Sequence, residues 1–221
     1  MKKLYFLILL LISSFSSSLI AQKTIEYKDE IINQLDENNK QTGLWKLYDD
    51  EKNILITCSF KDGNYASNTN YYKDSKLIAS YDNFDIIEIY KKGKTIKASF
   101  FKRPDNATTL VDDKGKELDT SIIKYFFQSG QALPIYYGGM SKFYEYIRGK
   151  TNFRNKEKGR VVVKFYINEK GETSNAEIVE SDNVNLDEIA KQIVSDSPRW
   201  QPAHQRGIFV KCSYSIPIVF N

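Results

Sequence analysis

The residues that could act as nucleophiles or bases in this 221-residue chain are few. His204 is the only histidine, and Cys58 and Cys212 are the only cysteines. A cysteine becomes a strong nucleophile when an imidazole takes its proton, so these residues could form one constellation, a Cys–His pair. However, Cys212 alternates with apolar residues in a predicted strand, which indicates a small buried side chain, and Cys58 lies in a different region. We therefore expect no catalytic thiol.

Acidic side chains gather in short stretches that have the composition of turns. Asp49–Glu51 and Asp112–Asp113 each lie beside a lysine, as in solvated turns. A calcium loop requires oxygen ligands at alternating positions and a closing glutamate, which neither stretch supplies. A single histidine excludes a zinc motif built on two histidines, and no phosphate-binding loop, G-x-S-x-G or C-x-x-C motif occurs. The sequence thus predicts a non-enzymatic protein with no catalytic residue, cofactor or metal.

Residues 1–21 have the composition of a secretory signal peptide. A basic start is followed by an apolar run from Leu4 to Ile12, a serine-rich segment and Leu19-Ile20-Ala21, which resembles a cleavage site. A membrane anchor is the alternative, but the apolar run is shorter than the roughly 20 residues that a span requires. We expect cleavage before Gln22, export, and no stable transmembrane span in the mature protein.

Charge and cysteine usage narrow the range of partners. The chain has a formal charge of +4, and removal of Lys2 and Lys3 with the signal lowers it to +2, without a basic block or stripe in the sequence. Nucleic acid is therefore not an expected partner. Export permits a disulfide, but a Cys58–Cys212 bond would have to join two separate regions within the short Cα distance that a disulfide requires. We favour two free thiols.

Residues 22–130 form the first of two regions with different patterns. Short aromatic strand-like pieces alternate with polar turns, and Asp62-Gly63, Lys92-Gly93 and Lys114-Gly115 are hairpin turn signals. The pieces recur at a spacing of roughly 20 residues and resemble MORN-type β-repeats, with "GLWKLYDDEKNIL" as the best copy. We expect a stack of two-stranded units, each of which needs its neighbours to bury one face.

The aromatic side chains of this region support two interpretations. Exposed rows of tyrosine and tryptophan can hold sugars or peptides, whereas cross-strand aromatic pairs that only stabilise a sheet are commoner. The residues concerned are Trp45, Tyr48, Tyr71, Tyr72, Tyr81 and Tyr90. A cell-envelope glycan- or surface-binding module that uses these β-repeats is therefore the alternative function.

Residues 131–221 have the pattern of a compact α+β domain, with two helices packed on an antiparallel three-stranded sheet. Apolar side chains recur at helical spacing in 140–147 and 185–195, and at alternating positions in strands at 161–167 and 208–220. The residues predicted to face inward from the helices are Met140, Phe143, Tyr144, Ile147, Leu186, Ile189, Ala190, Ile193 and Val194. Asn185 is the predicted N-cap of the second helix, in a capping box with Glu188.

A corner with unusual composition, "SDSPRWQPAHQRG" at 195–207, connects the second helix to the last strand. Pro198 ends the helix, and Trp200 is expected to cover the seam between helix and sheet. His204 has no titratable partner nearby in the sequence, which predicts a surface position. The residues of this predicted structural corner are Pro198, Trp200, Pro202 and Gly207.

Three stretches of this second region together resemble the TonB C-terminal domain. They are "LPIYYGGMSKFYEYI", "GRVVVKFYINEKGETSNAEIVES" and "PRWQPAHQRG" followed by a strand that ends in "PIVF", and they cover roughly the last 90 residues. This family forms the periplasmic end of the energy transducer for outer-membrane transporters. The resemblance implies a binding module whose small sheet receives an extended transporter peptide, the TonB box, by strand addition. The implied partner-binding edge strand consists of Val210, Lys211, Cys212, Ser213, Tyr214, Ser215 and Ile216.

The sequence departs from a complete transducer of this family. Such a protein needs a membrane helix and a long proline-rich arm, whereas this chain has only 5 prolines, none of them clustered, and β-repeats in place of the arm. The resemblance therefore implies an exported protein in the periplasm or at the outer-membrane periphery of a Gram-negative-type bacterium. Its expected partner is an envelope protein or peptide, such as an outer-membrane transporter, and direct energy transduction is not expected.

Overall fold

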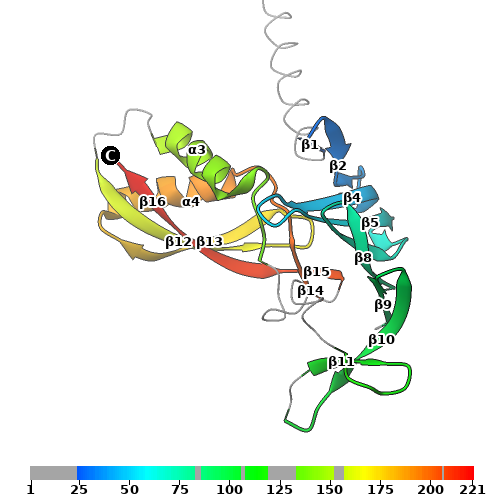
Figure 1. Cartoon of the computed structure of the whole chain (residues 1–221). Helices are drawn as coiled ribbons and strands as arrows, with labels where there is room; N and C mark the ends of the chain where they lie inside the picture. Colours follow the sequence, from blue (N-terminus) through cyan, green and yellow to red (C-terminus); the bar gives the residue numbers. More distant parts are fainter. Residues whose placement is uncertain (1–23, 83–85, 106–107, 119–132, 152–156, 206) are drawn as a thin grey trace, which may run out of the picture. The chain divides into compact units, whose positions relative to one another are not determined.

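The computed structural model describes residues 24–82, 86–105, 108–118, 133–151, 157–205 and 207–221 (Figure 1). The predicted signal peptide and the predicted boundary between the two regions lie outside these residues. In the described part of the chain, no helix is both long enough and apolar enough to cross a membrane. The elements are β1 (Ile25–Tyr27), β2 (Glu30–Ile32), β3 (Gln34–Leu35), β4 (Gln41–Asp49), β5 (Ile54–Lys61), β6 (Asn64–Tyr65), β7 (Thr69–Lys73), β8 (Lys76–Tyr81), β9 (Ile86–Lys91), β10 (Lys94–Lys102), β11 (Thr108–Asp112), α3 (Gly139–Thr151), β12 (Gly159–Ile167), β13 (Thr173–Ser181), η3 (Val184–Leu186), α4 (Asp187–Ser195), β14 (Ala203–Gln205), β15 (Ile208–Val210) and β16 (Cys212–Phe220).

Two compact units divide the chain, and the division runs through β4 and β5. The first unit contains the chain up to Lys46 together with Cys58–Ser67. Its core is built around Trp45, which is fully buried and lies edge-on to Phe60 with ring centroids 5.4 Å apart. The Trp45 indole N–H donates to the backbone carbonyl of Gln34, so the polar atom of this buried ring is satisfied.

The second unit contains Leu47–Thr57 and Asn68–Asn221 and begins with an antiparallel meander, β7–β11. Its hairpins turn through pairs of residues with positive φ, Asp74-Ser75 and Lys92-Gly93, as two-residue turns of right-twisted hairpins require. The predicted hairpins are therefore present. They form one continuous sheet, however, and not a stack of separate two-stranded units, because each strand of the meander pairs with the next along the chain.

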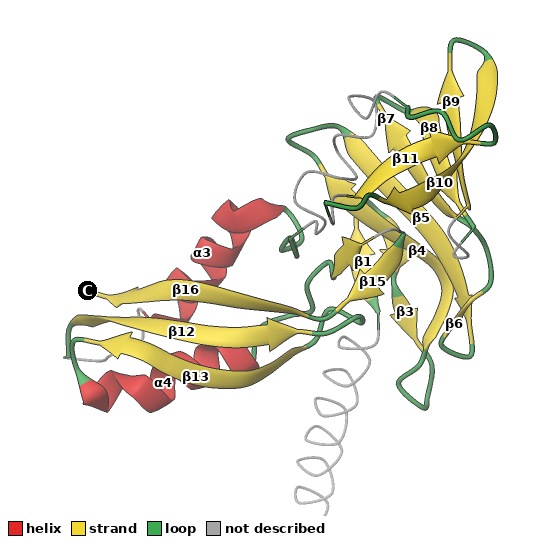
Figure 2. Cartoon of the chain, turned by 90° about the horizontal axis from the view of Figure 1, so that it is seen from below, coloured by secondary structure: helices red, strands yellow, loops and turns green. Residues whose placement is uncertain are grey.

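The C-terminal part of the second unit has the predicted α+β fold. An antiparallel three-stranded sheet in the order β13-β12-β16 carries both helices, α3 and α4, on one face (Figure 2). The alternation in β12 explains this layer, because Val161, Val163, Phe165 and Ile167 are all fully buried under the helices. The hairpin turn between β12 and β13 closes where predicted, with the Gly171 N–H donating to the Asn168 carbonyl at 2.9 Å.

The helices differ from the prediction in which side chains face inward. Tyr144 and Ile189 are each 41% exposed, although helical spacing placed both on the apolar face. Tyr146 turns inward instead, and its hydroxyl donates to the Ile193 carbonyl at 2.9 Å, which links α3 to α4. Burial raises the pKa of Tyr146 to about 12, so it keeps this proton.

The start of the second helical segment is also corrected. The cap is Asn183, whose side chain accepts from the Asn185 N–H, and a short 3-10 helix, η3, precedes α4. The predicted capping box of Asn185 and Glu188 is therefore wrong. Both asparagines suit an N-cap, and the 3-10 turn simply begins the helical segment two residues earlier.

Candidate functional site

The last strand, β16, is the candidate site that the sequence indicated, and it lies at an edge of the three-stranded sheet. It pairs with β12 in unbroken register from Cys212 opposite Ile167 to Phe220 opposite Gly159. Tyr214, Ile216, Ile218 and Phe220 face the helices, whereas Lys211, Ser213 and Ser215 are exposed, as the alternation predicted.

The expected edge strand begins later than predicted. Val210 is not part of it, because Val210 belongs to β15 and pairs with Ala203 of β14. Lys211 separates the two strands, and its ammonium lies 4.6 Å from the centroid of the Tyr166 ring. The alternation continues through Lys211 without a break, so the side-chain pattern does not reveal that the chain changes partner there.

The backbone of β16 presents hydrogen-bonding groups on its outer side. In an antiparallel pair, alternate residues direct their N–H and C=O groups to opposite sides. Pro217, opposite Val162, has no N–H, and proline is tolerated in a ladder where its nitrogen faces away from the neighbouring strand. We infer that Ser213 and Ser215, which have the same parity as Pro217, direct their N–H and C=O groups to the outer side. In the described chain, no strand pairs with that side.

The opposite edge of the same sheet, β13, is irregular. Its register with β12 shifts twice, between Val162 and Val163 and between Lys164 and Tyr166. Asn175 in this strand has φ +51, in the left-handed region. Bulges and charged side chains such as the exposed Glu177 interrupt the row of backbone groups that an incoming strand would need. The two edges of this sheet are therefore unequal, and only β16 is regular.

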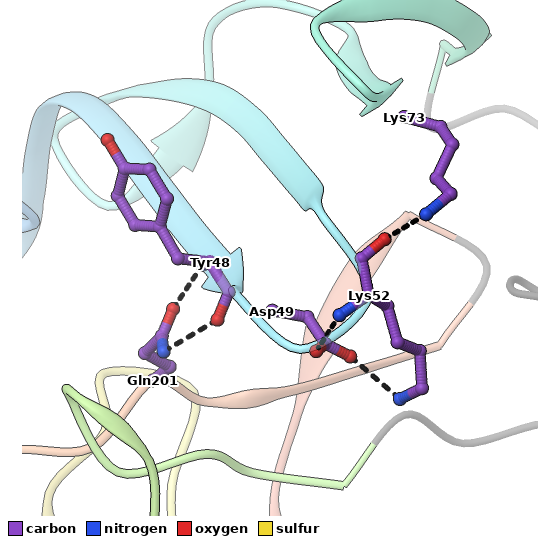
Figure 3. Close-up of polar contacts among 5 residues, drawn as sticks. All are labelled: Tyr48, Asp49, Lys52, Lys73 and Gln201. Carbon is purple, nitrogen blue, oxygen red and sulfur yellow. Dashed lines mark hydrogen bonds and ion pairs between the residues drawn. The ribbon is translucent and has the colours of Figure 1, made fainter.

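The long edges of the other sheet are covered by the chain itself. On β4, the Gln201 side chain accepts from the Tyr48 N–H and donates to the Tyr48 carbonyl at 3.0 Å, as a neighbouring strand would (Figure 3). On β11, the chain folds back, and the Leu118 N–H donates to the Leu110 carbonyl at 2.9 Å. Such covering removes free backbone groups that could recruit another strand.

The predicted corner lies directly beneath β16. Trp200 is fully buried, and its ring lies between 4.6 and 5.9 Å, centroid to centroid, from the rings of Tyr136, Phe143, Phe165 and Tyr214. Its indole N–H donates to the Ser197 hydroxyl at 3.2 Å. Tyr214 is a β16 residue, so this ring cluster fixes the position of the edge strand.

The corner contains two further features that the sequence did not predict. Arg199 is buried and donates from both Nε and Nη2 to the Lys170 carbonyl, at 2.9 and 2.7 Å, while burial lowers the pKa of its guanidinium. Gly171 has φ +83, and a Cβ built there would lie 1.8 Å from the Trp200 carbonyl oxygen. Both contacts join the β12–β13 turn to the corner. Because about 30 residues of sequence separate the two segments, no local sequence pattern predicts these contacts.

Gly207 has a further role besides starting a strand. Its φ is +76, and an added Cβ would lie 2.3 Å from Cδ1 of Tyr81. Its carbonyl accepts from the Thr69 hydroxyl at 2.8 Å. Gly207 therefore permits close packing between the β14–β15 turn and the meander, which makes it a packing residue as well as a flexible one.

The sequence predicted a surface position for His204, and the structure corrects this prediction. His204 lies in β14 opposite Phe209, it is half-buried, and its ring is 5.8 Å from that of Tyr71. Burial lowers its pKa to about 4. The imidazole is therefore neutral at physiological pH and serves as part of the packing between β14 and β7.

This burial predicts a specific acid sensitivity. Between the unfolded pKa of about 6.5 and the folded pKa of about 4, the unfolded chain binds a proton that the folded chain does not. The free energy of unfolding should thus fall by about 2 kcal/mol between pH 7 and pH 4.5 on account of His204 alone. Urea unfolding at both pH values measures it. His204→Gln should lose that part of the pH dependence, and an unchanged pH dependence would contradict a half-buried neutral histidine.

Both cysteines have thiols whose pKa values burial raises. Both are free thiols, as favoured from the sequence. Burial raises the pKa of the Cys58 thiol far above its ordinary value and also raises that of Cys212, so both remain protonated. Within the described ranges, no group of three or more His, Cys, Asp or Glu side chains is placed to hold a metal ion.

Half of the aromatic residues named for the β-repeats form core. Trp45, Tyr71 and Tyr81 are each at most 3% exposed. They cannot belong to an exposed row that holds a sugar, and the interpretation as cross-strand core pairs explains them better. The alternative of a glycan-binding surface therefore loses three of the six residues on which it depended, whereas Tyr48, Tyr72 and Tyr90 are half-buried.

Comparison with known proteins places the C-terminal region in a family. Residues 152–221 match the family model described as Gram-negative bacterial TonB protein C-terminal. No curated protein and no solved structure shows significant similarity to the chain. The match spans β12, β13, η3, α4, the Trp200 corner and β16, which are the elements that build the regular edge. Residues 152–221 of this chain are therefore a domain of the TonB C-terminal family.

Proposed function

We propose that the protein is a non-enzymatic docking protein of the cell envelope that receives an extended segment of its partner along β16. One observation carries this proposal: among the longer strand edges described, β16 alone is regular and has no neighbour on its outer side. β13 is bulged, and β4 and β11 are covered. Natural sheets protect their edges in these ways, so an unprotected nine-residue strand favours a partner strand.

The chemistry of the edge suits a reversible partner. From Lys211 to Ser215 the exposed side chains are small or charged, at Lys211, Ser213 and Ser215, which keeps this part of the edge soluble and leaves room for the side chains of an added strand. Pro217 removes one donor from the outer side, so the usable stretch is Cys212–Ile216. A partner segment of about five extended residues would match it, with main-chain hydrogen bonds as the main source of affinity.

The family match supports an outer-membrane transporter as the partner. The family consists of C-terminal domains of TonB proteins of Gram-negative bacteria, and the sequence resemblance implies recognition of a transporter's periplasmic peptide. We place the protein in the periplasm or at the outer-membrane periphery, without a role in direct energy transduction.

Site-specific photocrosslinking in the native envelope tests this function. A benzophenone amino acid at Ser215 should crosslink to the N-terminal periplasmic segment of an outer-membrane transporter. The same probe at Glu177, on the bulged edge of the same sheet, is the matched control and should give no such product. Equal products at both positions, or products at Ser215 that contain no transporter segment, would refute strand docking at β16.

A further inference from the structure

Five lysines gather at one end of the β7–β10 meander. In β7–β8, Lys73 pairs directly with Lys76, and in β9–β10, Lys91 pairs directly with Lys94. β8 and β9 are neighbours with Ala79 opposite Ile89, so the same register leads Lys76 toward Lys92 in the adjacent turn. We call the exposed set Lys76, Lys91, Lys92 and Lys94 the lysine tip. Three of its lysines lie together in the sequence, in "KKGK" at 91–94, and the fold adds Lys76 from the other hairpin.

The charge of the tip is not neutralised locally. The segment Ile86–Lys102 contains five lysines and one glutamate, a formal charge of +4 that equals the charge of the whole chain. Glu88, the one acid, lies 3.9 Å from Lys97, and Asp74 lies 3.7 Å from Lys73, neither of which belongs to the tip. None of the four tip lysines has an ion pair with another described residue. The β9–β10 hairpin thus carries an excess of positive charge, and three of its five lysines, Lys91, Lys92 and Lys94, belong to the tip.

Two residue positions at the tip disfavour folding of the β9–β10 hairpin. Like charges directly opposite each other, as in the Lys91–Lys94 pair, are destabilising. Lys92 has φ +50 ahead of Gly93 at φ +74, a pair of positions where Asn-Gly is strongly preferred. Residues that break local rules without a compensating contact within the protein are characteristic of functional positions.

Tyrosines flank the lysines. Tyr72 precedes Lys73, Tyr90 precedes Lys91, and both rings are half-buried and close enough to interact electrostatically. Lysine together with tyrosine is the composition of protein surfaces that rest on a membrane interface, where the charge meets the phosphates and the ring lies at headgroup level. Several exposed cations at the end of a sheet suit a flat, diffuse anionic surface.

We propose that the lysine tip binds the surface of a membrane that contains anionic phospholipids. Each lysine near such a surface contributes about 1 kcal/mol of electrostatic attraction, so several act together where one would be too weak. The tip lies in the meander, apart from β16 in sequence and in a different sheet. Membrane attachment is therefore a second binding activity, separate from strand docking.

Vesicle binding by the full mature chain tests the proposal. Sedimentation with vesicles of equal parts phosphatidylglycerol and phosphatidylcholine should retain the protein at about 0.1 M salt. Phosphatidylcholine vesicles alone should not, and about 1 M salt should release it, because the Debye length falls to about 3 Å. The variant Lys91→Gln/Lys92→Asn/Lys94→Gln should bind the anionic vesicles about 100-fold more weakly. It relieves the like-charge pair and creates Asn-Gly, so the hairpin should fold at least as well.

A matched variant separates placement from total charge. Lys61→Gln/Lys116→Gln/Lys158→Gln removes three exposed lysines elsewhere and has the same net charge as the tip variant. It should bind anionic vesicles like the unaltered protein. Equal losses in both variants, or no binding of the unaltered protein to anionic vesicles, would overturn the proposal. So would a tip variant that keeps vesicle affinity but loses affinity for soluble polyphosphate, because the occupant would then be a polymer.

Discussion

Replacing Gly171 with alanine should remove most of the stability of the C-terminal domain. The backbone at Gly171 has φ +83, which disfavours any side chain, and the new Cβ would lie 1.8 Å from the Trp200 carbonyl oxygen. The Trp200 N–H also donates to the Gly171 carbonyl at 2.8 Å, so the two segments cannot separate without losing this bond. We expect a loss of more than about 4 kcal/mol, a large share of the 5–15 kcal/mol that stabilises a typical domain.

Two other glycines provide controls for this prediction. Gly115 has a similar φ of +77 but open space around its Cβ position, so Gly115→Ala should show the backbone strain alone, about 1 kcal/mol. Gly149 lies inside α3 with open space and no unusual φ, so Gly149→Ala should stabilise the helix by roughly 1 kcal/mol. Hydrogen exchange of β12 amides reports on this core directly. If Gly171→Ala lowered the free energy of unfolding no more than Gly115→Ala does, the contact between Gly171 and Trp200 would not be tight.

Replacing Trp200 with alanine should have the next largest effect. The side chain is fully buried among four aromatic rings, and removing it leaves a cavity that those rings can fill only in part. We expect a loss of about 3–5 kcal/mol in the free energy of unfolding. Trp200→Phe keeps most of the apolar contact but leaves the Ser197 hydroxyl without its indole donor, so it should cost about 1–2 kcal/mol.

This prediction has a second readout at the edge strand. The Trp200 ring lies 5.6 Å from that of Tyr214, which in turn approaches the Met140 sulfur at 3.7 Å. Loss of the indole should therefore increase hydrogen exchange at Tyr214 and Ile216 more than at β13. Denaturant unfolding and exchange in the same samples measure both effects. A loss below about 1 kcal/mol, or exchange that rises equally in both edge strands, would contradict the role of Trp200 in holding β16.

Much of the C-terminal domain was predictable because its signals are local. Alternating apolar residues in 161–167 predict a strand that buries one face, and helical spacing around Ala190 and Ile193 predicts a helix that does the same. The structure has both elements, as β12 and α4. Proline and glycine at the corner marked where the helix had to end. Tyr144 and Ile189 were placed inward by spacing alone, and their exposure depends on how far each helix extends over the sheet, which spacing does not encode.

The remaining features could not be predicted because they depend on contacts between distant residues. Gln201 bonds with Tyr48, 153 residues away, and a glutamine in a loop gives no hint of such a partner. The half-buried state of His204 depends on Tyr71 in the meander. The unequal edges of the sheet depend on bulges in β13, whose apolar and polar residues alternate too irregularly to locate them. The candidate edge itself was predicted as a strand, whereas its exact start at Cys212 was not.

We expect a partner strand to add to β16 through the outward N–H groups of Ser213 and Ser215. The most direct measurement is amide NMR of the protein during titration with a peptide from the periplasmic N-terminus of a transporter, in comparison with Ser215→Pro and Ser215→Ala. We predict that the amide signals of Cys212–Ile216 shift and become protected from exchange, whereas those of β13 do not. Ser215→Pro should weaken peptide binding at least 10-fold because it removes one outward donor, and Ser215→Ala should bind the peptide normally. Shifts confined to β13, or undiminished binding by Ser215→Pro, would contradict this expectation.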